Sequence, residues 1–197
     1  MSERKESHFF AMMSRMKYIE RWALMRNSIK ENISEHSLEV AMISHLLATL
    51  GNVRLGKALN ADRAALIGLY HDSTEIITGD MPTPIKYYNP QIKDAFKAVE
   101  DVAGHKLLSM LPEDLQETYR PIFFKEEEDA YLWKLVKAAD KISALIKCIE
   151  EEKNGNTEFF SAKQTLESSV KAMNLEEAEM FLKEFLPSYY KNLDELN

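Results

Sequence analysis

Apolar residues recur along most of the chain at intervals of three and four, the spacing that places side chains on one face of an α-helix. The first such stripe follows Ser7, a candidate N-cap, and the second runs from about Ser34 to Gly51. The residues predicted to face inward are Phe9, Phe10, Met13, Met16 and Ile19 in the first helix, and Leu38, Val40, Ile43, Leu46, Leu47 and Leu50 in the second. The alternating pattern of a half-buried strand is rarer, so an all-α fold is predicted.

A third helix is predicted after the Asn60 cap, over "ADRAALIGLYHDSTEIIT", with Gly79 at its end. The next segment, "GDMPTPIKYYNP", is rich in proline and is expected to form a shaped loop. Further helices are predicted over 91–111, 127–153, 158–173 and 175–186. Because no linker or repeat divides the sequence, residues 1–197 are expected to fold as a single globular domain.

Composition narrows the classes of function. The chain is 45% apolar and 29% charged, as expected for a soluble globular protein, and its net charge of −7 opposes binding to a nucleic-acid polymer or an anionic membrane. The apolar runs are shorter than the roughly 20 residues that span a bilayer, which favours a cytoplasmic location. Cys148 has no partner for an intrachain disulfide. A small phosphorylated substrate is compatible with this charge if a metal ion or an arginine supplies local positive charge.

Two histidines and two aspartates lie on or beside apolar faces. His36 shares a helical stripe with Val40, His71 follows an apolar run and precedes Asp72, and Asp140 lies beside the apolar face of a later helix. Taken singly, a histidine here is explained by a hydrogen-bonded imidazole in the core, and an aspartate by a cap or an ion pair. As a set from three helices, they match the ligand chemistry of a divalent cation and leave positions for water and substrate.

In order along the chain, His36, His71-Asp72 and Asp140 resemble the H…HD…D signature of the HD-domain phosphohydrolases, all-helical metalloenzymes that act on phosphate esters. Longer segments resemble one branch, the bacterial 5′-deoxynucleotidases of the YfbR type: "SHFFAMMSRMKYIERWALMRN", "ENISEHSLEVAM", "LYHDSTEIITGDMPTPIKYYN", "VKAADKISALIKCIEEEKNGNTEF" and "FLPSYYKNLDEL". The resemblance covers nearly the whole chain and thins between Leu111 and Tyr131, where no role is carried over. It implies an HD-domain helical bundle that hydrolyses deoxyribonucleoside 5′-monophosphates to deoxynucleoside and phosphate.

The resemblance also implies roles for individual residues. One divalent ion, with Co²⁺, Mn²⁺ or Cu²⁺ suggested, would be bound by His36, His71, Asp72 and Asp140. Glu75 would handle the leaving-group proton, although its spacing alone also fits a pair with a surface lysine. The implied substrate contacts are Arg21 for the phosphate, Trp22 and Asp80 for the sugar, and His36, Asp72, Met81, Pro82, Thr83 and Asp140 around them. The family further suggests a homodimer.

Two alternatives are open on the sequence alone. An HD-type phosphodiesterase or pyrophosphohydrolase acting on larger nucleotides would need extra basic residues for the additional phosphates, and few lysines or arginines are clustered here. A non-catalytic, metal-dependent nucleotide sensor would need neither Glu75 nor Arg21 beside the four ligands. Both features favour the phosphomonoesterase.

Overall fold

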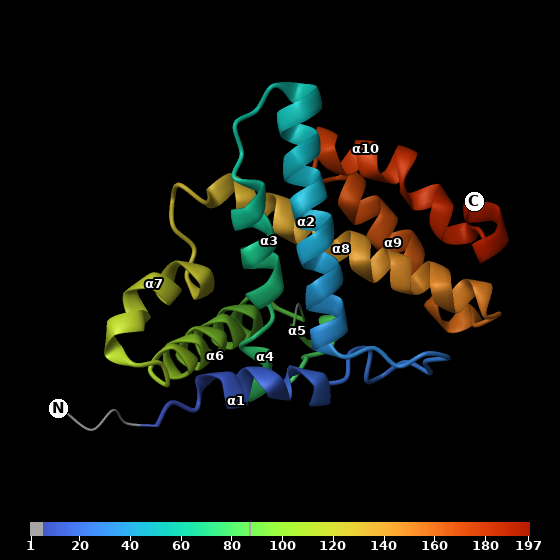
Figure 1. Cartoon of the computed structure of the whole chain (residues 1–197). Helices are drawn as coiled ribbons and strands as arrows, with labels where there is room; N and C mark the ends of the chain where they lie inside the picture. The colour runs from blue at the N-terminus through green and yellow to red at the C-terminus, as the bar shows by residue number, and fades with distance from the viewer. Residues whose placement is uncertain (1–5, 87) are drawn as a thin grey trace.

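In the computed structural model, which describes residues 6–86 and 88–197, every regular element is a helix (Figure 1). The elements are α1 (Phe9–Met13), η1 (Ser14–Tyr18), α2 (Ile33–Leu55), α3 (Ala61–Tyr70), α4 (Glu75–Thr78), α5 (Thr83–Lys86), α6 (Pro90–Leu108), α7 (Glu113–Phe123), α8 (Ala130–Lys153), η2 (Thr157–Phe159), α9 (Phe160–Lys171), α10 (Glu176–Glu184), η3 (Leu186–Tyr190) and η4 (Leu193–Leu196). The all-α prediction is confirmed. Among the described residues, no helix has both the length and the apolar character that crossing a membrane requires.

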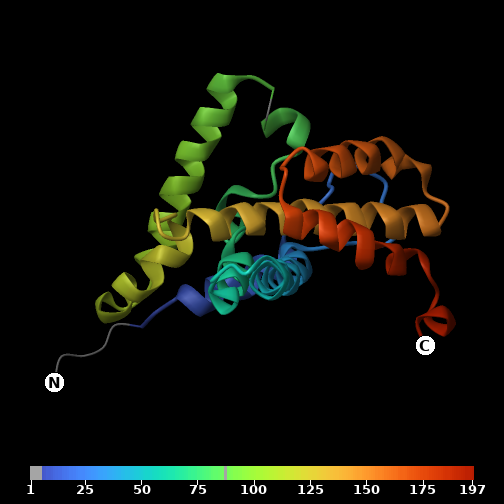
Figure 2. The same ribbon diagram turned by 90° about the horizontal axis from the view of Figure 1, so that it is seen from above.

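Helices α2, α3 and α8 form the centre of the fold. α2 and α3 lie side by side, and both cross α8, as Figures 1 and 2 show from two directions. The core between them includes Val40, Ile43, Leu47, Ile67, Leu135, Ala139, Ile142 and Ile146. A second cluster, of Phe9 on α1, Leu107 and Leu108 on α6 and the following Leu111, packs against Tyr119 and Phe123 of α7. Burial of the first cluster fixes α2, α3 and α8 relative to one another.

The first helix departs from the prediction in its cap and in one buried position. Ser7 does not cap α1; its hydroxyl donates instead to the Met110 carbonyl at 2.7 Å. Phe10 was predicted to face inward but is 60% exposed, whereas Phe9 is fully buried. Phe9 and Phe10 are neighbours in α1 and lie about 100° apart around the helix axis, so the face that buries Phe9 leaves Phe10 toward solvent.

Helix α2 begins before and ends after its predicted bounds. Asn32 caps it, accepting from the Glu35 amide while the Glu35 side chain accepts from the Asn32 amide. The helix continues through Gly51 to Gly56, whose left-handed backbone (φ 66°) ends it. A Cβ at Gly51 would lie 2.8 Å from Glu177 Oε1, so that glycine serves close packing and not termination. Leu38, predicted to be buried, is 55% exposed because it lies well away from the stripe of His36 and Val40.

The third predicted helix is interrupted where its polar residues lie. α3 follows the predicted Asn60 cap but ends at Tyr70, and α4 begins at Glu75. Between them, the Ser73 amide donates to the Tyr70 carbonyl and the Glu75 amide to the Asp72 carbonyl, both over three residues. This tighter turn holds the His71-Asp72 pair. α7, with Pro121 inside it, lies in the segment for which no helix was predicted.

Candidate metal centre and the segment beside it

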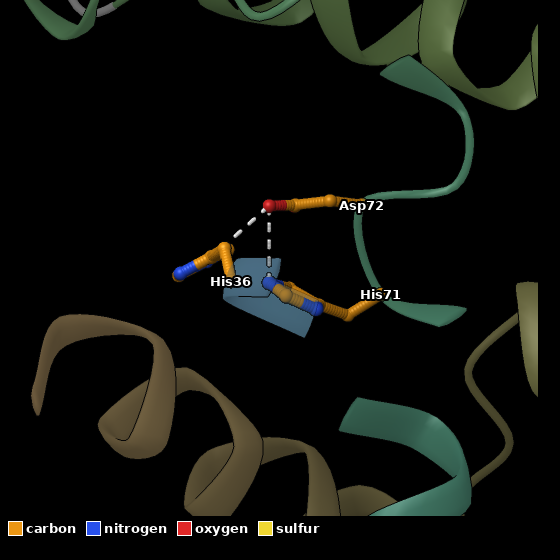
Figure 3. Close-up of side chains that lie close together, drawn as sticks. All are labelled: His36, His71 and Asp72. Atoms are coloured by element: carbon orange, nitrogen blue, oxygen red, sulfur yellow. Dashed lines mark ion pairs between the residues drawn. The ribbon is translucent and has the colours of Figure 1, made fainter. Parts of the chain in front are cut away.

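Four of the predicted residues meet where α2, the turn after α3 and α8 come together. His36 lies in the first turn of α2 and Asp140 in the middle of α8. Figure 3 shows His36 and His71 directed toward Asp72, whose Oδ2 lies 3.5 Å and 3.2 Å from their Nε2 atoms. One ligand atom from each of these three residues lies within 4.8 Å of the others. Asp140 Oδ1 adjoins the group at 3.2 Å from His36 Nε2.

The orientation of His71 is fixed by the end of α3. Its Nδ1 lies 2.8 Å from the Gly68 carbonyl, an acceptor only, so Nδ1 carries the proton and Nε2 presents its lone pair. Gly68 also lets α3 approach α2, because a Cβ there would lie 3.0 Å from the Ala41 Cα. The close approach brings the imidazole rings of His36 and His71 to a centroid separation of 5.3 Å.

The donor atoms fit a cation. Among the described residues, neither His36 Nε2 nor His71 Nε2 has a hydrogen-bond partner, although both are buried. Each faces carboxylate oxygens, so lone pairs face lone pairs, which is unfavourable unless a positive charge lies between them. Two imidazole nitrogens and two carboxylates suit a divalent first-row ion.

The electrostatics of the group also favour bound positive charge. Burial opposes ionisation of Asp72, but the His71 and His36 imidazoles, when protonated, and the Arg21 guanidinium outweigh it and hold the pKa of that carboxyl well below its usual range. The pKa of Asp140 is also lowered, because the contact with His36 exceeds the effect of burial. Burial and the nearby Arg21 charge lower the pKa of His36, so its imidazole is neutral, as a metal ligand must be.

Glu75 is a buried carboxyl that holds its proton at neutral pH. It begins α4, is 5% exposed, and its Oε2 has no hydrogen-bond partner among the described residues. Burial first, and then the charges of Asp72 and Asp80, raise the pKa of Glu75 to about 9. A neutral carboxylic acid next to the candidate metal ligands is able to donate a proton.

Arg21 and Trp22 lie on the segment 19–32, which connects η1 to α2. An antiparallel bridge between Glu20 and Asn32 closes this segment, and the Arg21 amide donates to the Glu31 carbonyl at 2.9 Å. The Arg21 side chain reaches Asp72 Oδ2 at 3.3 Å and so adjoins the candidate metal centre. Trp22 has a left-handed backbone (φ 59°), which is rare for a bulky side chain and indicates strain held by its contacts.

Glu31 holds both of these side chains and was not predicted from the sequence. Its Oε2 accepts from Arg21 Nε at 3.2 Å and from Trp22 Nε1 at 2.9 Å. The Trp22 ring also meets the Phe159 ring edge to face, with 5.2 Å between centroids. An acidic residue on a loop carries no periodic signal, so the sequence offered no means of finding it. Farther along, the buried Glu151 of α8 accepts from the Ser28 and Ile29 amides and anchors the segment.

The remaining predicted residues lie on the chain after α4. Burial raises the pKa of Asp80, and the nearby Arg21 charge and Trp22 backbone oppose the rise, so Asp80 lies near both residues. Met81 and Pro82 are half-buried, and Thr83, at the start of α5, is exposed. Arg26, on the same segment as Arg21, has a side chain that is 90% exposed and pairs with Glu158. Lys86 pairs with Glu100 at 2.8 Å.

The fold is that of the HD-domain phosphohydrolases. An HD-domain phosphohydrolase from Listeria innocua superposes with a TM-score of 0.81 at 22% identity, covering 92% of this chain and 88% of that one. The cyanophage S-2L HD phosphohydrolase DatZ, solved with dA and one catalytic Zn²⁺ ion, gives 0.63 at 19% identity, covering 92% and 96%.

Sequence similarity identifies the branch. The family description 5′-deoxynucleotidase YfbR-like matches residues 8–189. The 5′-deoxynucleotidase VP0926 of Vibrio parahaemolyticus is 50% identical over 98% of this chain and 100% of its own length. The 5′-deoxynucleotidase YfbR of Escherichia coli O1:K1 is 47% identical, over 98% and 97%. The chain belongs to the 5′-deoxynucleotidase YfbR-like family, as its sequence resemblance implied.

Proposed function

We propose that the chain is a metal-dependent 5′-deoxynucleotidase, which hydrolyses deoxyribonucleoside 5′-monophosphates to deoxynucleoside and phosphate. Its relatives at 47–50% identity carry the name 5′-deoxynucleotidase. The observation that carries the proposal is the unpartnered pair of imidazole nitrogens facing Asp72, with Arg21 on one side. A purely structural metal site would need neither the adjacent arginine nor a buried neutral carboxyl.

The residues divide the work of phosphate-ester hydrolysis. A divalent ion held by His36, His71, Asp72 and Asp140 would supply a Lewis acid for a phosphoryl oxygen and lower the pKa of a water molecule. Arg21 orients the substrate phosphate, for which its planar guanidinium is suited. As the water oxygen bonds to phosphorus and the bond to the sugar 5′-oxygen breaks, Glu75 donates its proton to that oxygen. A proton released by the attacking water restores the acid.

The substrate sugar would lie between Trp22 and the chain after α4. Trp22 would exclude a ribose 2′-hydroxyl by leaving neither room nor a partner for it, and Asp80 would accept from the 3′-hydroxyl. Met81, Pro82 and Thr83 would line the sugar and the phosphate, with proline lowering the ordering cost of binding. The support for this arrangement is that Asp80 lies near both Arg21 and the Trp22 backbone, whose effects oppose the rise in its pKa.

The direct test is phosphate release from dAMP and from AMP, with Mn²⁺ and with EDTA. The proposal expects release from dAMP that EDTA abolishes, and much slower release from AMP. Equal rates for the two nucleotides would refute the role of Trp22 in excluding ribose. No release with Mn²⁺, Co²⁺ or Cu²⁺ would refute the enzyme and favour a nucleotide sensor, and release only from diesters or diphosphates would favour the other HD-type activity.

Glu31→Gln is expected to lower kcat/KM for dAMP about 10- to 100-fold, because hydrogen bonds to a charged group contribute about 1.5–3 kcal/mol. The substitution removes the charge that holds Arg21 and weakens the bond to Trp22 Nε1. Selectivity for dAMP over AMP is expected to fall as well. Glu20→Gln is the control, since Glu20 lies on the same segment and pairs only at the surface with Lys30. Equal effects of the two substitutions would contradict the role of Glu31.

The remaining features of the proposal concern the whole molecule. We propose a single HD domain that works in the cytoplasm with Mn²⁺, Co²⁺ or Cu²⁺, and that forms a homodimer. The side chain of Phe10 on α1 is 60% exposed, which supports self-association through that helix. Light scattering on a sizing column tests the dimer, and a mass of one chain at micromolar concentration would refute it.

A further inference from the structure

A hydroxyl and a carboxylate lie behind His36, on the side away from the candidate metal centre. Ser143 of α8 is fully buried, and its Oγ lies 2.9 Å from His36 Nδ1. The same hydroxyl donates to Glu39 Oε2 at 2.6 Å. These contacts form a relay that runs from Glu39 on α2, through Ser143 on α8, back to His36 on α2.

The single hydroxyl proton of Ser143 sets the direction of these hydrogen bonds. A hydroxyl has one proton, and Ser143 gives it to Glu39, so while Glu39 is ionised the serine oxygen accepts from His36. This contact favours the tautomer of His36 that carries its proton on Nδ1. The other atom near Nδ1, Glu31 Oε1, is 3.8 Å away and too distant to hydrogen-bond. Ser143 is thus the residue that selects the tautomer.

The selected tautomer is the one that a metal site needs. With the proton on Nδ1, the lone pair of His36 lies on Nε2, which is 3.2 Å from Asp140 Oδ1 and 3.5 Å from Asp72 Oδ2. His71 reaches the same state through the Gly68 carbonyl. Both imidazoles therefore donate from Nδ1 and keep the Nε2 lone pair free. The acceptor is a backbone carbonyl for His71 and the Ser143 hydroxyl for His36.

Burial disfavours the ionised form of Glu39, and the hydrogen bond from Ser143 stabilises that form. Burial raises the pKa of Glu39 to about 7, with the charges of Glu150 and Glu31 adding to the rise, while the Ser143 hydrogen bond and the Arg21 charge oppose it. A half-buried carboxyl that contacts no metal ligand directly has no evident task in packing. Its hydrogen bond to Ser143 gives it one.

We propose that Ser143 and Glu39 are positioning residues that hold His36 in its metal-binding tautomer and thereby set the affinity for the divalent ion. The inference rests on the metal centre of the proposed function and is independent of its substrate. Residues that orient a metal-bound histidine in this way contribute about 10- to 100-fold to metal affinity. The sequence alone does not predict either role, because the contacts join positions more than 100 residues apart.

The test is calorimetric titration of the metal-free full chain with Mn²⁺. Ser143→Ala is expected to weaken binding about 10- to 100-fold, and Glu39→Gln to weaken it less. The double variant is expected to resemble Ser143→Ala alone, because Glu39 acts through Ser143. Ser44→Ala is the matched control: Ser44 is also fully buried on α2, and its hydroxyl has no partner in the described part of the chain. Glu150→Gln controls for loss of a nearby negative charge.

A second readout separates positioning from a general loss of structure. Nitrogen-15 NMR of the metal-free protein is expected to show a larger fraction of His36 protonated on Nδ1 in the wild type than in the Ser143→Ala variant. Equal Mn²⁺ affinity in the Ser143→Ala and Ser44→Ala variants, or an unchanged tautomer, would overturn the relay. If Ser143→Ala does not fold, Glu39→Gln decides by the same two measurements.

The relay and the proposed function fail in different ways. Tight Mn²⁺ binding by the wild type, without hydrolysis of dAMP, would overturn the activity and leave the relay standing. Absence of Mn²⁺ binding by the wild type would overturn both.

Discussion

Replacing Glu75 with glutamine is expected to lower kcat for dAMP by about 10²- to 10⁴-fold, the usual contribution of a positioned general acid. Glutamine has nearly the same shape but cannot release a proton to the leaving 5′-oxygen. The effect should fall on kcat and leave Mn²⁺ affinity unchanged, since Glu75 is not among the candidate ligands. Steady-state kinetics with calorimetry of Mn²⁺ binding measures both quantities.

The pH profile gives the same prediction a second measurement. Glu75 must be protonated to act, so activity is present below its pKa and is lost as the pH rises through it. Its pKa is about 9, and a cation beside Asp72 offsets one of the charges that raise it, so the alkaline limb is expected below pH 9 and should be absent in Glu75→Gln. Glu177→Gln is the control, because Glu177 of α10 is a fully buried glutamate that pairs with Lys57. A normal kcat for Glu75→Gln would remove the acid from the mechanism.

Asp72→Asn is expected to cause the other large loss. The single oxygen Oδ2 of Asp72 lies within 3.5 Å of His36 Nε2, His71 Nε2 and Arg21 Nη1, so it joins the metal ligands to the residue that orients the phosphate. Removing its charge should weaken Mn²⁺ binding at least about 10-fold and lower kcat/KM for dAMP by about 10³-fold or more, because metal activation and phosphate orientation fail together.

A second histidine–aspartate pair, between α2 and α3, provides a control for Asp72→Asn. Asp62 faces His45 at 3.6 Å, but its side chain is 97% exposed, so Asp62→Asn makes the same chemical change in a histidine–aspartate pair at the surface. Its kinetics and Mn²⁺ affinity should match the wild type. An Asp72→Asn variant that behaved like Asp62→Asn would show that the buried pair has no special role.

The helices that pack into the centre were predictable, because their apolar stripes and caps are local features. Asn60 caps α3 as predicted, and Val40 and Leu47 are buried as their spacing indicates. The break after Tyr70 was not predicted. The residues that follow, "HDST", are weak helix formers whose side chains compete with the backbone, and their run was too short to outweigh the apolar pattern on either side.

The candidate site was predictable to the extent that its residues interrupt apolar faces. His36, His71, Asp72 and Asp140 could be identified in this way, and the structure brings them together. Their supports could not be found, because Glu31, Glu39 and Ser143 look like ordinary polar residues until the fold places them beside Trp22 and His36. The left-handed backbone of Trp22 likewise depends on tertiary contacts.

A crystal structure of the protein with Mn²⁺, with the ion located by its anomalous scattering, tests the central claim most directly. The account predicts one ion bonded to the Nε2 atoms of His36 and His71 and to carboxylate oxygens of Asp72 and Asp140. An ion bound elsewhere, or an occupied crystal in which those side chains lie beyond bonding distance of it, would contradict the account.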